Sequence, residues 1–192
     1  MTLKNLDPQF LKEIRNNAIK NPRKKFCAAV ISDVFPHIND FFRLDFIKKL
    51  NKYKFIDMGG RYNNTIGGPV QNKTKFLFEY KFSIAMENTK GDGYTTEKII
   101  DSFYSGTIPI YYGDYMVDEY INPKTYILIK GVMDLEQKIE YIKKIDNNNE
   151  LYIRIMKEEV FNNKKIIEIT EKEHSDFLIH IFNQDKDKAK RI

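Results

Sequence analysis

The chain has 192 residues, of which 42% are hydrophobic and 14% aromatic, and it carries a net charge of +5 with a pI near 9.0. This composition is globular and excludes an intrinsically disordered chain. The length supports one substantial core but would strain two full domains, so we expect a single domain over residues 1–192. The basic surplus suits anionic nucleotides, membranes or nucleic acid without selecting among them, and we expect most lysines to form an ordinary solvated surface.

The first eighty residues are predicted to alternate helices with strands. A helix is expected to open at Asp7 or Pro8 and to run to about Asn21, where the following proline breaks it. The apolar run Lys25–Ser32 predicts a buried strand. Beyond it we expect a helix over 39–53, a strand over 55–58, a glycine-rich loop over 59–68 and a short helix over 73–80.

The rest of the chain continues this alternation and then becomes helical. Strands are expected over 82–87, 108–112 and 125–129, with a helix from Tyr94 or Thr95 to about Ser105 and a short helix over 115–121. After Val132, helices are expected over 133–145, 151–161 and 164–181. The alternation predicts an α/β fold with a parallel sheet and helices on both faces. We expect its core over 24–145, with the carboxy-terminal helices of 133–185 packed back on the sheet.

The segment Tyr80–Gly113 is the most informative stretch, because it reads as strand, loop, helix and strand, one βαβ unit. The loop at the first crossover of such a unit is where parallel sheets bind nucleotides and sugars. Gly91 and Gly93 give this loop conformational freedom. Thr95 or Thr96 is expected to cap the helix, whose free amides and dipole favour an anion.

Two charged residues in the first turn of this helix suggest ligand contacts. Lys98 is a cation where the helix dipole disfavours one, which suggests that it neutralises a bound phosphate. Glu97 can accept hydrogen bonds from sugar hydroxyls. The alternative, an ordinary capped surface helix with a solvated Glu–Lys pair, stays open on these residues alone.

The run ENTKGDGYTTEKIIDSFYSGTIPIYYG, residues 87–113, resembles the signature of glycosyltransferase family 10, the α-1,3/4-fucosyltransferases. The resemblance continues through Phe42-Arg43, 48–60, 80–82 and 121–124, and covers roughly residues 24–145. It implies a Rossmann-like parallel sheet that corresponds to one half of a GT-B glycosyltransferase. This half would be the carboxy-terminal domain that binds the donor GDP-fucose, and the amino-terminal acceptor domain would be absent from the chain.

The resemblance also assigns donor-binding residues: Arg43, Asn88, Tyr94, Glu97 and Lys98. Arg43 and Lys98 would offset the diphosphate charge of the leaving group, so no metal and no cofactor are expected. Asn88 would bind phosphate or cap the loop, Tyr94 would contact base or ribose, and Glu97 would hold hydroxyls of ribose or fucose. A solvent-facing Arg43 is the alternative. The segment after Ser32 departs from the family pattern, so Arg43 could be displaced.

The expected reaction is an inverting single displacement that transfers fucose to a glycan acceptor and needs a general base. The catalytic base is unknown, because the family places it in the acceptor domain. The chain would then be a fragment, a degenerate remnant or a subunit that uses a separate acceptor-domain protein. Two alternatives remain: a noncatalytic nucleotide-sugar-binding module, and a basic nucleic-acid-binding α/β domain. The second ranks far lower, since no aromatic-interleaved basic motif is present, and no nucleic-acid partner is expected.

The remaining features suggest structural roles and a default location. Cys27 lies in an apolar run and is expected in the core, and Tyr111 and Tyr112 are expected to be structural. His174 and His180 are six residues apart, a poor spacing for a shared metal. Because no apolar stretch reaches the length of a membrane span and no signal-peptide core is seen, a cytoplasmic location is expected. Peripheral contact with the inner face of the membrane stays open.

Overall fold

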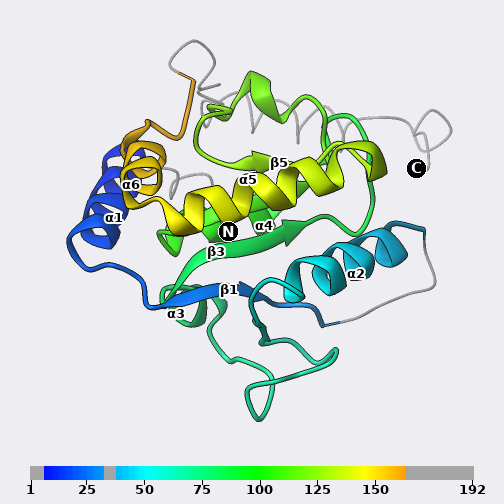
Figure 1. Cartoon of the computed structure of the whole chain (residues 1–192). Helices are drawn as coiled ribbons and strands as arrows, with labels where there is room; N and C mark the ends of the chain where they lie inside the picture. The colour runs from blue at the N-terminus through cyan, green and yellow to red at the C-terminus, as the bar shows by residue number, and fades with distance from the viewer. Residues whose placement is uncertain (1–6, 33–37, 163–192) are drawn as a thin grey trace, which may run out of the picture. The chain divides into compact units, whose positions relative to one another are not determined.

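Five parallel strands form the centre of the described chain, in the spatial order β2-β1-β3-β4-β5 (Figure 1). The strands are β1 (Lys25–Ala29), β2 (Ile56–Met58), β3 (Tyr80–Met86), β4 (Ile108–Tyr112) and β5 (Ile127–Leu128). The helices are α1 (Pro8–Lys20), α2 (Ile38–Asn51), α3 (Lys73–Leu77), α4 (Glu97–Tyr104), α5 (Leu135–Asn147) and α6 (Asn149–Lys157), with 3-10 turns at η2 (Val117–Glu119) and η3 (Val132–Asp134).

This computed structural model describes residues 7–32 and 38–162, which fall in a unit that ends at Asn162. The helix expected over residues 164–181 and the loop that follows Ser32 lie outside the described residues. The same holds for the three histidines, His37, His174 and His180. Within the described part of the chain, no helix is both long and apolar enough to cross a membrane.

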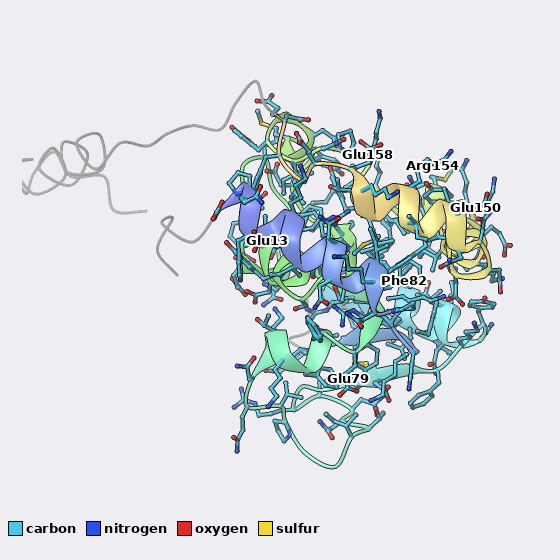
Figure 2. The ribbon with its side chains drawn as sticks, turned by 90° about the vertical axis from the view of Figure 1, so that its left-hand side faces the viewer. Glu13, Glu79, Phe82, Glu150, Arg154 and Glu158 are labelled. Carbon is cyan, nitrogen blue, oxygen red and sulfur yellow. The ribbon has the colours of Figure 1, made fainter. Side chains whose placement is uncertain are left out.

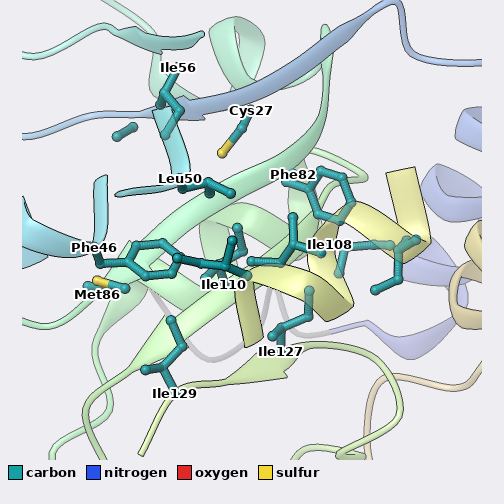
Figure 3. Close-up of a cluster of buried hydrophobic side chains, with 14 of the residues drawn as sticks. Cys27, Phe46, Leu50, Ile56, Phe82, Met86, Ile108, Ile110, Ile127 and Ile129 are labelled. Atoms are coloured by element: carbon teal, nitrogen blue, oxygen red, sulfur yellow. The ribbon is translucent and has the colours of Figure 1, made fainter. Parts of the chain in front are cut away.

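One face of the sheet packs against α2 and α5 (Figure 1). Phe46 and Leu50 of α2 point toward the strands and belong to the same buried cluster as Phe82, Ile108 and Ile110 (Figure 3). A further group from α5 joins the same cluster: Leu135, Ile139, Ile142 and Ile145. All these side chains are almost fully removed from water, which is the main favourable contribution to folding.

The opposite face packs against α4 and α1. Ile99 and Phe103 of α4 share a cluster with Leu11 of α1 and with Ala85 and Tyr111 of the sheet. Alternate residues of β3 therefore enter different clusters, as the two-residue period of a strand requires. Helices on both faces of a parallel sheet confirm the predicted Rossmann-like α/β class.

Strand order creates a switch point between β1 and β3. The chain leaves β1 through α2 to reach β2 at the sheet edge, and then returns to β3 on the other side of β1. The helices that follow β1 and β3 lie on opposite faces of the sheet. In open α/β sheets the crevice outside the carboxyl ends of the strands at such a point is where ligands bind.

Several predicted boundaries are wrong by a few residues, for identifiable reasons. The strand predicted to reach Ser32 ends at Ala29, because the carbonyl of Ile31 accepts a hydrogen bond from Tyr62 in the next loop. Residues predicted as helix up to Tyr80 stop at Leu77, since Tyr80 already pairs with β1. The expected short helix over 115–121 is only the turn η2, the strand over 125–129 is only β5, and α6 covers Asn149–Lys157 in place of 151–161.

Candidate functional site

Arg43 reaches the end of β3 at the switch point. Its guanidinium Nη1 donates a hydrogen bond to Oδ1 of Asn88 at 3.1 Å. Arg43 is buried, with 4% of its surface exposed, although Asn88 itself is exposed. The alternative of a solvent-facing arginine is therefore wrong. Asn88 lies two residues beyond β3, so the contact places a cation at the carboxyl end of that strand.

Glu87, one residue before Asn88, turns to the other face and lies under the start of α4. Its buried carboxylate accepts hydrogen bonds from Thr96 N at 2.9 Å, from Thr96 Oγ1 at 2.7 Å and from Lys98 Nζ at 3.0 Å. Gly113 makes room for it, since a Cβ there would lie 2.5 Å from Glu87 Cγ. Glu87 thus joins the end of β3 to the first turn of α4.

This arrangement corrects the predicted cap of α4. Thr96 occupies the N-cap position but makes no side-chain cap hydrogen bond, because its hydroxyl donates to Glu87. The helix begins at Glu97, and neither Tyr94 nor Thr95 belongs to it. The first-turn amides of α4 therefore have no hydroxyl cap, and the N–H of Glu97 interacts with the carboxylate of the same residue.

Lys98 lies in the first turn, as predicted, and its misfit with the dipole has an intramolecular explanation. The ammonium pairs with Glu87 at 3.0 Å and lies 3.7 Å from Glu97 Oε1. Two carboxylates thus stabilise a cation where the helix dipole disfavours it. The same bonds hold the ammonium at the start of α4. A role of Lys98 toward phosphate stays a prediction.

Glu97 projects from the first turn with 56% of its side chain exposed. Partial burial alone would raise the pKa of this carboxyl, but its own backbone N–H and the charges of Lys98 and Lys73 hold the pKa below its usual range. Glu97 is therefore an ionised, accessible acceptor at neutral pH, a state suited to hydroxyl groups.

The glycine loop between β3 and α4 is held by a second buried carboxylate, that of Asp114. Its Oδ1 accepts a hydrogen bond from Gly93 N at 2.9 Å, and its Oδ2 accepts one from Thr95 Oγ1 at 2.9 Å. Gly93 has a φ of 75°, a left-handed conformation that side chains with a Cβ disfavour. Between the two anchored residues, Tyr94 leaves 45% of its surface exposed.

Lys90 anchors the loop at another point. Its Nζ donates a hydrogen bond to the carbonyl of Lys130, just past β5, at 2.9 Å, and lies 4.0 Å from the centroid of the Tyr115 ring. Partial burial lowers the pKa of Lys90. The loop is thus connected to the neighbouring segments after β4 and β5, and it brings a further cation to the carboxyl edge of the sheet.

Sequence reasoning assigned no role to Glu87, Asp114 or Lys90. A signal for the two acids was present, because each stands one or two residues beyond a buried strand that ends at the binding edge of the sheet. Nothing in the local sequence of Lys90 distinguishes it from the many solvated lysines. Its role depends on Lys130, forty residues away.

The predicted site residues come together in two groups on either side of the end of β3. Arg43 and Asn88 form one group, on the α2 side. Glu97 and Lys98 form the other, on the α4 side, and Tyr94 is exposed on the loop that leads to it. The groups are linked through the consecutive residues Glu87 and Asn88, so both cations border the same strand end.

The predicted structural residues are confirmed as such. Tyr111 and Tyr112 are buried, and the Tyr112 ring lies 4.5 Å from that of Phe42 between the centroids. Cys27 is fully buried, and burial raises the pKa of its thiol, which confirms a core role and disfavours a nucleophilic one. Among the described residues, no group of three or more His, Cys, Asp or Glu side chains could hold a metal ion.

A cavity of about 350 Å³ lies away from these groups, beside α5 and α6. Figure 2 shows two of its lining residues, Arg154 on α6 and Glu158 just after it. The lining consists of Lys124, Tyr141, Leu151, Arg154, Ile155 and Glu158. None of the predicted donor-binding residues lines this cavity.

Comparison with known proteins gives a consistent result. The model of glycosyltransferase family 10 (fucosyltransferase), C-terminal region, matches residues 20–181. The chain is 39% identical over 117 residues to an α-(1,3)-fucosyltransferase FucT of Helicobacter pylori, covering 61% of this chain and 24% of that protein. It is 31% identical over 164 residues to the putative fucosyltransferase R654 of Acanthamoeba polyphaga mimivirus, covering 79% of this chain and 26% of that protein.

Solved structures similar to this chain are also fucosyltransferases. The fold matches that of an α1,3-fucosyltransferase crystallised with GDP-fucose, with a TM-score of 0.77 and 32% identity, over 94% of this chain and 56% of the other. A structure of α1,3-fucosyltransferase with GDP matches with a TM-score of 0.75 and 33% identity, over 91% and 54%. The chain thus spans about a quarter of these curated relatives and just over half of the crystallised chains. It belongs to glycosyltransferase family 10, the fucosyltransferases, and matches their carboxy-terminal region.

Proposed function

We propose that the chain binds GDP-fucose at the carboxyl edge of its sheet and serves its inverting transfer to a glycan acceptor. The observation that carries this proposal is the placement of Arg43 and Lys98 on either side of the end of β3. Support comes from the 32% identity with a fucosyltransferase crystallised with GDP-fucose, over nearly the whole chain.

The diphosphate would lie between Arg43 and the first turn of α4. A guanidinium donates several parallel hydrogen bonds and suits phosphate oxygens, and the Asn88 contact holds it in place. Because Glu87 compensates the charge of Lys98, much of the anionic charge falls to Arg43 and to the α4 dipole. Lys98 would therefore serve the diphosphate mainly as a hydrogen-bond donor in a fixed position, and less as a source of net positive charge.

The sugar and nucleoside would be held by the more exposed residues. The carboxylate of Glu97 accepts hydrogen bonds from hydroxyls of ribose or fucose, and the ring of Tyr94 packs against base or ribose. Such contacts orient the anomeric carbon toward the acceptor.

In the reaction, the acceptor oxygen forms a bond to the anomeric carbon while the bond from that carbon to the diphosphate breaks. The acceptor proton passes to a general base, and GDP leaves with the bonding electrons. Arg43, Lys98 and the α4 amides stabilise the charge that develops on the leaving group. We propose that these groups suffice without a divalent cation, which unchanged turnover in EDTA would support.

The base is expected outside the described residues, in an acceptor domain that either precedes this region or is a separate protein. The chain would then act as the donor half of a GT-B enzyme, as a single domain. The alternative of a noncatalytic nucleotide-sugar module differs only in turnover, so donor hydrolysis and transfer assays separate the two.

Cytoplasmic location, with or without peripheral membrane contact, is likewise a proposal that cell fractionation tests.

Calorimetric titration with GDP, GDP-fucose, GDP-mannose and UDP tests the binding step. We expect both GDP and GDP-fucose to bind and UDP to bind at least about tenfold more weakly, because a different base loses specific contacts. Arg43→Ala should weaken GDP binding by about tenfold or more. Lys157→Ala, an exposed residue at the end of α6, is the matched control and should leave it unchanged. Equal affinity for UDP, or a silent Arg43→Ala, contradicts the proposal.

A further inference from the structure

Asp114 forms hydrogen bonds with the residues on both sides of Tyr94. One carboxylate oxygen accepts from the N–H of Gly93 and the other from the hydroxyl of Thr95, each at 2.9 Å. These two residues flank Tyr94 in the chain. A single side chain from the segment after β4 therefore anchors both neighbours of Tyr94, whose own N–H donates to the carbonyl of Gly91 at 3.1 Å.

Asp114 is itself held firmly. It is 1% exposed, and its Oδ1 also accepts from Met116 N at 2.8 Å. Its own N–H donates to the hydroxyl of Tyr111 at 3.2 Å, and that hydroxyl lies 3.4 Å from Thr95 Oγ1. A buried carboxylate is stable only when it is well hydrogen-bonded. The bonds to Asp114 therefore favour the loop conformation in which all of them form.

The rigidity of the backbone contrasts with the exposure of the ring. Tyr94 is 45% exposed, while Gly93 adopts a φ of 75° that brings its N–H to Asp114. A large ring presented to solvent on an anchored backbone is suited to meet a ligand without a loss of loop entropy on binding.

We infer that Asp114 is a positioning residue, which places the ring of Tyr94 against the nucleoside of the bound nucleotide sugar. The inference rests on the proposed function. Asp114 is not expected to touch the ligand, because its carboxylate is buried and accepts its hydrogen bonds from Gly93, Thr95 and Met116. In this inference the effect of Asp114 on binding passes through Tyr94, and not through its other partners Met116 and Thr95.

A double-mutant cycle on the full chain tests this route, with GDP as the probe and calorimetry as the readout. Asp114→Ala should weaken GDP binding by about tenfold, because the loop loses its anchor. In a Tyr94→Ala background, the same substitution should change the affinity by less than about twofold. A general loss of structure would weaken binding equally in both backgrounds, which would overturn the inference.

Asp114→Asn is the conservative variant. Its Oδ1 can keep both backbone bonds and its amide can donate to Thr95 Oγ1, so we expect GDP affinity within about threefold of the unmodified chain. If Asp114→Ala fails to fold, Thr95→Val replaces it in the cycle, since it removes one of the two anchors and leaves the carboxylate in place.

GDP binding by the unmodified chain separates the proposed function from the role of Asp114. If the unmodified chain binds no GDP, the proposed function falls and this inference falls with it. If the unmodified chain binds GDP but Asp114→Ala binds equally well, only the inference is overturned. Unequal effects in the two backgrounds, with rescue by Asp114→Asn, support it.

Discussion

The ammonium of Lys98 lies 3.0 Å from the buried carboxylate of Glu87, and this pair connects the end of β3 to the start of α4. The pair explains why a cation is tolerated in the first turn of a helix. It also determines how Lys98 can serve a ligand, because the charge is compensated before any phosphate arrives. The consequences can be measured separately as stability and as binding.

Glu87→Gln should destabilise the fold. The substitution leaves Lys98 without its main partner and weakens two bonds from Thr96, so we expect a loss of about 2–4 kcal/mol in unfolding free energy. Urea denaturation measures it. Glu136→Gln removes an exposed partner of Lys49 and is the control, with an expected change below about 0.5 kcal/mol. Equal effects of the two substitutions would contradict a structural role for Glu87.

Lys98→Met should weaken GDP binding by more than the loss of a single hydrogen bond from the Lys98 ammonium would. The buried carboxylate of Glu87 would remain uncompensated beside the diphosphate, so we expect a drop of about a hundredfold. Adding Glu87→Gln removes the repulsion and should restore about tenfold of the affinity. Titration calorimetry of the three variants tests this, and a double variant no better than Lys98→Met refutes the charge argument.

Acid should reduce the stability of the fold by protonating Asp146. This residue lies near the end of α5 and pairs with Lys81 at the start of β3, whereas the candidate site lies at the end of β3. Burial alone would raise the pKa of Asp146, but hydrogen bonds from Lys54, Lys81 and Tyr53 hold the pKa below its usual value. A carboxyl with a lowered pKa in the folded state stabilises the fold above about pH 4. This contribution is lost as the pH falls through the folded-state pKa.

Asp146→Asn should remove that contribution. We expect a lower urea midpoint than that of the unmodified chain at neutral pH and a flatter decline of the midpoint between about pH 5 and pH 3. Parallel declines in the two proteins would show that other carboxyls dominate acid unfolding.

Gly60 is required by close backbone packing after β2. A Cβ at this position would lie 1.9 Å from the carbonyl oxygen of Ile31, and backbone atoms cannot simply move aside. Gly60→Ala should therefore reduce stability by about 3 kcal/mol or more. Gly131→Ala is the control, because no atom lies within 4 Å of its Cβ position and its φ of 166° is extended. Thermal melting of the two variants should differ clearly, and similar midpoints would refute the packing argument.

The fold was largely predictable, because local periodicity reports which residues face the sheet. The βαβ unit appears where the apolar runs and Gly106 predicted it, and Tyr111 and Cys27 are buried as expected. The predicted ends of helices and strands were wrong where a residue distant in the sequence determines where the element begins or ends. Tyr80 starts a strand because it pairs with Lys25, a contact that the local sequence does not reveal.

The site was predictable only in part, for the same reason. Thr96 is the N-cap residue, one of the two candidates predicted, but its hydroxyl does not cap the helix, because Glu87, nine residues before it, accepts that hydroxyl instead. The burial of Arg43 depends on packing at the switch point, and its partner Asn88 lies 45 residues away. Residue types in a motif predicted which side chains gather at the strand end, but not which of them neutralise one another.

The most direct test of the central claim is a crystal structure of this chain with GDP. The account predicts that the diphosphate lies at the carboxyl end of β3, within hydrogen-bond distance of the Arg43 guanidinium and of the first-turn amides or Lys98 Nζ of α4. Density for the nucleotide at another place, for example in the cavity beside α6, with Arg43 and Lys98 both keeping only their protein partners, would contradict it.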